Sequence, residues 1–221
     1  MTVVLVHGFW GSAFQWKGVV DDLYKKGQSK IKIVELSLQS LSDDARILKD
    51  CLDRIEDDVI LVGHSYGGVV ITEAGLDEKV KKLVYLAAIA PDVGEGIASI
   101  GKDYPLDNGL GKFLRKDGRG NLWIKEEAYK PFLCADVDDD TARFMAMALK
   151  PTQATLFGET VDHVAWKTKP SIYQVSTKDE MIHVDMQRFM ANRMGATIVE
   201  LDTSHMSMVA APEKISEIIL G

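Results

Sequence analysis

Short runs of apolar, largely β-branched residues alternate along the chain with segments whose apolar residues recur at helical spacing. Short apolar runs without polar interruptions are typical of strands that are buried on both faces. Because helical segments separate them, the pattern predicts an α/β fold with a doubly wound, mostly parallel sheet. We expect about six strands, at residues 3–6, 31–35, 59–62, 82–87, 171–175 and 196–200.

The clearest helical segment covers residues 12–26, where apolar side chains recur at spacings of three and four. Ser12 is suited to cap its N-terminus, and Gly27 is suited to end it. Apolar residues from 48 to 55 repeat the same spacing and predict a second helix. Pro212 is expected in the first turn of the last helix, because proline fits that position without losing a hydrogen bond.

Residues 92–150 interrupt the alternation of strands and helices. They contain a hairpin-like turn at 116–120 and a helical segment at 141–149 behind a run of acidic residues. In α/β enzymes, insertions of this kind often lie over the carboxyl ends of the strands. We therefore expect a core formed by residues 1–91 and 151–221, with a small cap (lid) at 92–150 inserted after the fourth strand.

The composition is that of one ordinary globular unit: 221 residues, 46% hydrophobic and 27% charged. The net charge of −7, without a run of Lys and Arg, argues against nucleic acid as a partner. No apolar run approaches the ~18 residues of a membrane span, and no signal-peptide pattern precedes the first expected strand. Cys51 and Cys134 form neither a disulfide framework nor a metal spacing. We expect a cytoplasmic protein without metal or cofactor.

A candidate nucleophile follows the third expected strand, in Gly63-His64-Ser65-Tyr66-Gly67. The pattern G-x-S-x-G between a strand and a helix is typical of a nucleophile elbow, in which glycines allow a turn too tight for side chains. This turn lifts the serine hydroxyl clear of the sheet, and the following helix directs its N–H groups at nearby negative charge. The alternative is a glycine-rich turn whose serine only caps the helix. We interpret Ser65 as a nucleophile.

A serine hydroxyl needs a general base, and histidine is the side chain suited to that near neutral pH. Of the five histidines, His205 follows the last expected strand, where the base lies when the chain order is Ser, acid, His. His64 lies inside the elbow, and His7 ends the first strand. His163 and His183 have no strand directly before them. His205 is therefore the expected base, the alternative being a histidine of a surface loop.

The acid that orients the base is expected in the loop after residues 171–175. That loop contains Asp179 and Glu180. We take Asp179 as the acid, with Glu180 as the alternative, because spacing does not separate two adjacent carboxylates. An oxyanion also needs two backbone N–H donors, for which the pattern indicates Tyr66, after the nucleophile, and Phe9, in the loop after the first strand.

These segments resemble the α/β-hydrolases, and within them the branch of plant salicylate and jasmonate methyl esterases, hydroxynitrile lyases and bacterial esterase relatives. The resemblance covers about residues 3–220 and is weakest across 100–150. It implies the α/β-hydrolase fold and catalysis without a cofactor. The shared segments are VLVHG at residues 4–8, VGHSYGG at 62–68, LAAIAPD at 86–92, DEMI at 179–182 and SHMSM at 204–208.

Two positions separate the chemistries of that branch. The lyases that this chain resembles carry threonine after the first-strand histidine and lysine after the catalytic histidine, whereas this chain has Gly8 and Met206, as the esterases do. An apolar methionine does not stabilise a cyanide anion. One departure is Ser204, where the plant members usually have aspartate.

For the substrate pocket, we expect contributions from Trp10, Met181, Met206, Trp123 and Phe144, although such side chains equally serve as core. Acidic residues at 136–140 lack the glycine and closing glutamate of a calcium loop, so they are interpreted as a helix N-terminus.

The sequence thus predicts a serine hydrolase that cleaves a small or medium carboxylic ester, with a small-molecule ester, and neither nucleic acid nor a membrane, as its partner. Two alternatives stay open. One is a hydroxynitrile or other C–C lyase on the same scaffold, and the other is a small-ligand receptor without catalysis.

Overall fold

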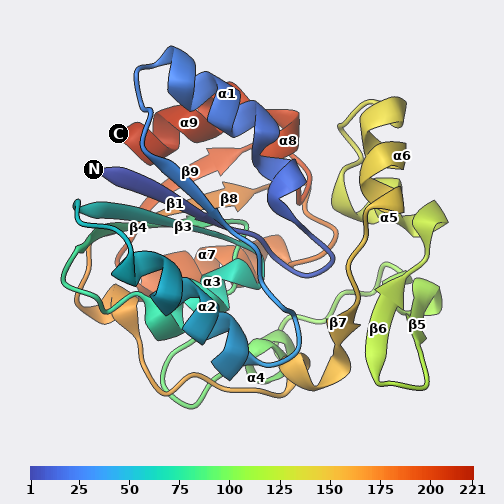
Figure 1. The fold of residues 1–221 in the computed structure, drawn as a ribbon. Helices are drawn as coiled ribbons and strands as arrows, with labels where there is room; N and C mark the ends of the chain where they lie inside the picture. Colours follow the sequence, from blue (N-terminus) through green and yellow to red (C-terminus); the bar gives the residue numbers. More distant parts are fainter.

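A parallel six-stranded sheet forms the centre of the molecule (Figure 1), with strand order β2-β1-β3-β4-β8-β9. The computed structural model describes all residues from Met1 to Gly221. The six predicted strands are confirmed, and their ends differ from the prediction by at most two residues. They are β1 (Thr2–Val6), β2 (Ile31–Val34), β3 (Val59–His64), β4 (Val80–Leu86), β8 (Ser171–Ser176) and β9 (Thr197–Leu201).

The central strands β1, β3 and β4 are mostly apolar and buried, because helices cover both faces of the sheet. In β1, Val4 and Val6 face one buried cluster, while Val3 and Leu5 face the other. The first cluster includes side chains of α2 (Leu41–Asp53), α3 (Gly67–Ala74) and α7 (Val184–Arg193). The second includes side chains of α1 (Lys17–Lys25), α8 (Ser207–Ala210) and α9 (Pro212–Leu220).

The predicted helix ends agree with the structure in most respects. The segment expected at 12–26 begins as a 3₁₀ turn, η1 (Ala13–Trp16), and continues as α1. Gly27 follows with φ of +84°, while the Ser12 side chain makes no capping hydrogen bond. Helix α9 starts at Pro212 as expected. Helix α2 begins earlier than the apolar spacing indicated, because the Ser40 side chain caps it by accepting a hydrogen bond from the Asp43 N–H.

Shorter elements lie between β4 and β8. Residues 110–153 form a lobe beside the sheet in Figure 1, whereas residues 97–101 lie at the lower rim of the molecule. The predicted hairpin turn joins β5 to β6, and β7 extends that pair into an antiparallel three-stranded sheet. In chain order these elements are α4 (Ile97–Gly101), η2 (Leu110–Phe113), β5 (Leu114–Lys116), β6 (Asn121–Ile124), α5 (Glu126–Leu133), α6 (Asp139–Met147), β7 (Thr152–Gln153), η3 (Ala154–Phe157) and η4 (Ala165–Lys167).

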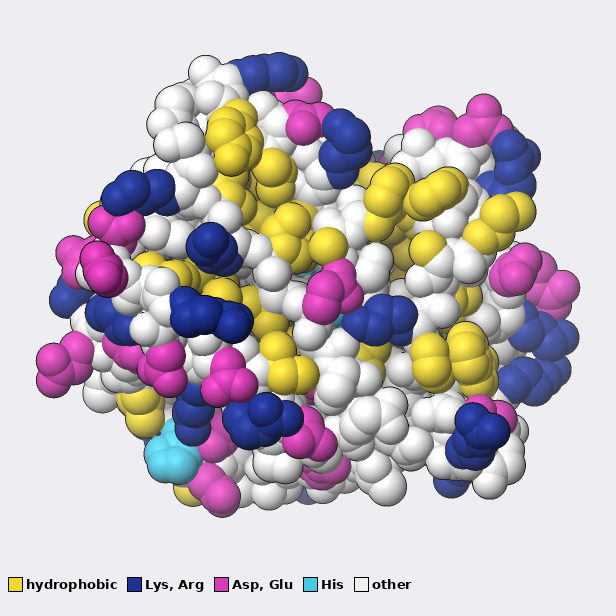
Figure 2. Space-filling model, viewed as in Figure 1, with side chains coloured by type: hydrophobic (Ala, Val, Ile, Leu, Met, Phe, Trp, Pro, Cys, Tyr) yellow, Lys and Arg dark blue, Asp and Glu magenta, His cyan; other side chains and the backbone are white.

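The lobe is joined to the body by apolar packing. Buried side chains of α5 and α6, such as Leu133 and Met145, belong to the same cluster as Leu5 of β1 and Leu23 of α1. Hydrophobic side chains are visible on the surface of the lobe in Figure 2. Phe144 of α6 is half-exposed. None of the helices combines the length and apolar character needed to cross a membrane.

Candidate active site

Ser65 occupies a sharp turn between β3, which ends at His64, and α3, which begins at Gly67. Its φ of +53° lies in the left-handed region, which non-glycine residues rarely adopt and which costs roughly 1–3 kcal/mol. Hydrogen bonds hold this conformation: the Ser65 N–H donates to the carbonyl of Leu86, and the Ser65 carbonyl accepts from the N–H groups of Gly68 and Ile89. The turn therefore has the strained geometry of a nucleophile elbow.

Glycines around Ser65 allow three backbone segments to meet. A Cβ at Gly67 would lie 2.5 Å from the Val6 carbonyl oxygen, and a Cβ at Gly63 would lie 2.6 Å from the carbonyl oxygen of Gly67. Gly8, in the loop after β1, has the same constraint, because a Cβ there would lie 2.6 Å from the Cβ of Ser65. Side chains are excluded at these positions, so the loop after β1 lies directly against the serine.

A cavity of about 220 Å³ opens beside Ser65, and His205 lines it as well. Most of its lining is hydrophobic, including Trp10 and Met181, which the sequence placed in the pocket. The remaining three expected pocket residues lie outside this lining. Met206 is buried in the core cluster shared with α1 and α9, Trp123 donates its indole N–H to Asp117, and Phe144 contacts the Phe14 ring on the surface.

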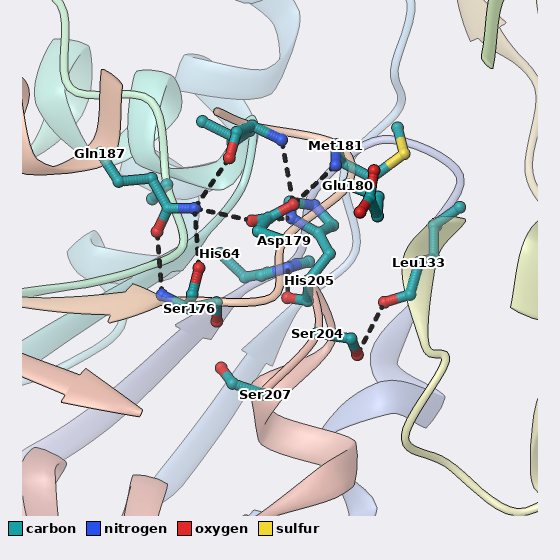
Figure 3. Close-up of polar contacts among 12 residues, drawn as sticks. His64, Leu133, Ser176, Asp179, Glu180, Met181, Gln187, Ser204, His205 and Ser207 are labelled. Carbon is teal, nitrogen blue, oxygen red and sulfur yellow. Dashed lines mark hydrogen bonds and ion pairs between the residues drawn. The ribbon is translucent and has the colours of Figure 1, made fainter. Parts of the chain in front are cut away.

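His205 and Asp179 are joined by a hydrogen bond of 2.8 Å between the imidazole Nδ1 and the carboxylate Oδ2 (Figure 3). Both side chains are almost entirely buried. The other Asp179 oxygen accepts the backbone N–H groups of Met181 and Ile182 at 2.7 and 2.9 Å. Glu180 points elsewhere and accepts a hydrogen bond from Asn108 at 3.0 Å. Of the two adjacent carboxylates, Asp179 is therefore the one that contacts the imidazole.

Gln187 of α7 lies behind this pair, and the sequence analysis did not select it. Its side chain is fully buried, and its amide nitrogen donates to Asp179 Oδ2 at 2.9 Å and to the Ile182 carbonyl at 3.0 Å. Its amide oxygen accepts the N–H of Ser176 at 3.0 Å. Gln187 thus ties the carboxylate to the end of β8 (Figure 3). No motif signalled it, since glutamine in a helix is ordinarily a surface residue.

His64 supports the same loop from the other side. Its Nε2 donates to the carbonyl of His205 at 3.1 Å, and its Nδ1 accepts from the Gln15 side chain at 3.2 Å. The two imidazole rings lie with centroids 4.6 Å apart. Burial, and then the charge of His205 nearby, lower the pKa of His64 well below its usual range. His64 is therefore neutral, which agrees with its role as a single hydrogen-bond donor.

The lobe also holds the His205 loop. The carbonyl of Leu133, at the end of α5, accepts from the Met206 N–H at 2.9 Å and from the Ser204 hydroxyl at 3.2 Å. Asp136 accepts from the Ser204 N–H at 2.8 Å and from the Ser204 hydroxyl. Ser204 thus pairs with a carboxylate supplied by the lobe.

Two backbone N–H groups beside Ser65 are free of protein partners. Neither the Phe9 N–H nor the Tyr66 N–H donates to another residue, although both residues line the cavity. The two rings stack with centroids 4.4 Å apart, and the Tyr66 hydroxyl donates to Asp44 at 3.0 Å. Burial raises the pKa of Tyr66, so the phenol stays neutral. The stacked rings thus hold the loop after β1 against the start of α3 beside the cavity.

The other titratable side chains form no metal site. No group of three or more His, Cys, Asp or Glu side chains is arranged to hold a metal ion. His7 is buried and accepts the Leu36 N–H at Nε2, while His163 is exposed and contacts Glu73. His183, in contrast, lines the same cavity as Ser65.

The fold and this arrangement are those of a hydrolase with a nucleophile elbow. A model of the alpha/beta hydrolase family matches residues 3–218, so the chain belongs to the α/β hydrolase family and the predicted fold is confirmed. Methylesterase 7 of Arabidopsis thaliana is 25% identical over 98% of this chain and 94% of that protein. Salicylic acid-binding protein 2 of Nicotiana tabacum is 26% identical over 98% of this chain and 95% of that protein.

Solved structures share the fold. The crystal structure of polyneuridine aldehyde esterase aligns with a TM-score of 0.84 over 99% of this chain and 97% of that one, at 18% identity. The predicted resemblance to plant methyl esterases is confirmed by the sequence relatives. Family and relatives together identify the chain as an enzyme of the esterase type.

Proposed function

We propose that this enzyme hydrolyses small or medium carboxylic esters through an acyl-enzyme intermediate on Ser65. The proposal depends chiefly on one observation: the imidazole bonded to Asp179 shares a cavity with Ser65 and with the unpaired N–H groups of Phe9 and Tyr66. A nucleophile, an oriented base and two free donors are the groups that acyl transfer requires.

In the proposed mechanism, the Ser65 hydroxyl attacks the ester carbonyl while His205 accepts its proton. Asp179 holds the imidazole with its proton on Nδ1 and stabilises the imidazolium that forms. The N–H groups of Phe9 and Tyr66 donate to the oxyanion of the tetrahedral intermediate. His205 then protonates the leaving alcohol, and water hydrolyses the acyl-enzyme by the same steps in reverse.

Residues 92–150 are proposed to act as the cap of this site. Three residues after α4, Tyr104, Pro105 and Leu106, line the cavity together with Ser65. From the other part of the segment, Leu133 and Asp136 hold the His205 loop. The segment therefore contributes both to the walls of the cavity and to the position of the base.

Two positions favour an ester over a cyanohydrin as substrate. A threonine in place of Gly8 would bring its Cβ within 2.6 Å of the Ser65 Cβ, so the loop after β1 would have to move. Met206 is buried in the core cluster and brings no positive charge to the cavity. A lyase that releases cyanide needs a cation near the leaving anion.

The test is hydrolysis of p-nitrophenyl acetate by the native protein and by Ser65→Ala. We expect the substitution to lower kcat/KM by at least ~10³-fold, because the nucleophile is lost while the oxyanion donors stay. A fluorophosphonate probe should label the native protein and leave the variant unlabelled. Equal turnover by both proteins would exclude the mechanism. Cyanide release from mandelonitrile without ester hydrolysis would favour the lyase, and absence of labelling would favour a receptor.

A further inference from the structure

The cavity beside Ser65 contains a second set of polar groups that the proposed mechanism does not use. Apart from Ser65 and His205, its polar side chains belong to Trp10, Tyr66, Tyr104 and His183. The Trp10 indole N–H donates to the Leu122 carbonyl at 3.0 Å, and the Tyr66 hydroxyl donates to Asp44. The Tyr104 hydroxyl and the Nε2 of His183 make no hydrogen bond within the protein. These two groups are therefore available to a ligand.

The cap contact of His183 indicates where the proton of its neutral ring lies. His183 is the N-cap of α7, and its Nδ1 accepts the N–H of Asp185 at 3.1 Å. An imidazole nitrogen that accepts a hydrogen bond carries no proton, so the proton of the neutral ring is on Nε2. The Tyr104 ring lies beside it, with the ring centroids 6.3 Å apart. Both groups can therefore donate a hydrogen bond into the cavity.

The rest of the lining restricts the ligand. No Lys, Arg, Asp or Glu side chain lines the cavity, and the lining residues that follow Tyr104 or flank His183 in sequence are apolar: Pro105, Leu106, Ile182 and Met186. A charged ligand would have to lose its hydration without a compensating ion pair. A neutral ligand with an acceptor oxygen would instead pair the free donors, and an apolar linker would fit the walls between.

We propose that Tyr104 and His183 bind a second, neutral acceptor oxygen of the substrate, such as a ketone carbonyl, separated from the reacting ester by an apolar spacer. The proposal rests on the proposed ester hydrolysis and specifies its substrate class. It makes both residues determinants of specificity, because only a substrate that carries the oxygen can pair with these two donors.

The experiment compares esters that differ only in this oxygen. p-Nitrophenyl 4-oxopentanoate is compared with p-nitrophenyl pentanoate, and 4-oxopentyl acetate with pentyl acetate, so that the ketone is tested on either side of the ester. Rates with the Ser65→Ala protein are subtracted. In at least one pair we expect the ketone to raise kcat/KM by about tenfold, the effect of one well-formed hydrogen bond.

Two variants test the assignment to these residues. Tyr104→Phe removes only the hydroxyl, and His183→Asn removes the imidazole Nε2–H, while the oxygen of the shorter asparagine side chain can still cap α7. In each variant we expect the ratio of kcat/KM between the ketone and its parent ester to fall to about a third or less of the native ratio. Tyr24→Phe and His163→Asn, both at exposed positions outside the cavity, are the matched controls and should keep the native ratio.

The outcomes separate this proposal from the proposed function. Hydrolysis of the parent esters without preference for either ketone would overturn the subsite and leave ester hydrolysis intact. A preference that survives both variants would also overturn it, since the oxygen would then bind elsewhere. Failure of the native protein to hydrolyse any of the four esters would contradict the proposed function itself.

Discussion

Asp179 and Glu180 have the same functional group, and their surroundings give them different tasks. The Asp179 carboxylate accepts four hydrogen bonds, from two backbone N–H groups, from Gln187 and from His205. Each of its oxygens is therefore held in place without a lysine or arginine beside it. Glu180 is at the surface and pairs with Asn108. Local hydrogen bonds, and not residue type, determine which carboxylate orients the imidazole.

The burial of His64 makes the free energy of unfolding depend on pH. Because burial lowers its pKa well below 6.5, the unfolded chain takes up a proton below that pH while the folded protein does not. The unfolded state then binds more protons, so the free energy of unfolding falls as pH falls, by up to ~1.4 kcal/mol per pH unit. Above pH 6.5 the group is neutral in both states and contributes no pH dependence.

The variant His64→Gln keeps a donor for the His205 carbonyl and removes the titration. We expect the free energy of unfolding of the native protein to fall more than that of the variant between pH 7.5 and pH 5, by up to about 2 kcal/mol. Urea unfolding of both proteins at the two pH values measures this difference. The same fall in both proteins would show that His64 does not carry the effect.

At the scale of elements, the site depends on the ends of β1, β3, β8 and β9, which meet at one edge of the parallel sheet. The loops after these strands contribute Phe9, Ser65, Asp179 and His205, in the order of the chain. Placement of functional residues at the carboxyl ends of parallel strands is general for open α/β sheets. The lobe also contacts this edge, because Leu133 at the end of α5 accepts a hydrogen bond from Ser204 in the His205 loop.

The contact between the lobe and the His205 loop is testable through Asp136. Asp136→Ala removes the two carboxylate oxygens that accept from the Ser204 N–H and hydroxyl. We expect kcat to fall by up to roughly tenfold with little change in KM, because the base is less well positioned. Asp136→Asn keeps one acceptor and should recover part of the loss. Steady-state kinetics on one p-nitrophenyl ester measures both values.

Asp139→Ala is the matched control, since that carboxylate is exposed and pairs with Lys130 away from His205. It should leave kcat at the native value. An equal effect of Asp136→Ala and Asp139→Ala, or a change confined to KM, would contradict a positioning role for Asp136.

At the scale of the whole molecule, the 221 residues form two buried clusters, one on each face of the sheet, and the lobe packs into one of them. Helices α5 and α6 have no core of their own, because their buried side chains join the cluster that contains α1 and α9. A segment without a separate core does not unfold separately from the elements on which it packs.

We therefore expect one thermal transition, with equal calorimetric and van't Hoff enthalpies. Met145→Ala, which removes a buried side chain of α6, should shift that single transition and lower the free energy of unfolding by about 2–5 kcal/mol. Differential scanning calorimetry tests both statements. Two transitions, with only the first shifted by Met145→Ala, would show that the lobe folds independently.

Much of the fold follows from local sequence, since buried parallel strands and amphipathic helices are recognised by their periodicity. The strands were predicted to within two residues, and helix α9 to its first proline. The elbow at Ser65 is equally local, because neighbouring glycines and a positive φ are properties of a few adjacent residues. Such features depend on covalent geometry and steric exclusion, which the sequence carries directly.

Only the tertiary structure determined the cavity lining and the hydrogen bonds that hold Asp179 and the His205 loop. Gln187 contacts the Asp179 carboxylate, and His64 contacts the His205 carbonyl, only because α7 and β3 bring them there, and no spacing in the sequence encodes those contacts. Met206 follows His205 directly, yet its side chain enters the core cluster and not the cavity. Tyr104 and His183, 79 positions apart in sequence, line the same cavity. Such contacts form when segments distant in sequence pack together. The sequence does not reveal them, because the hydrophobic effect is non-directional and does not specify which segments meet.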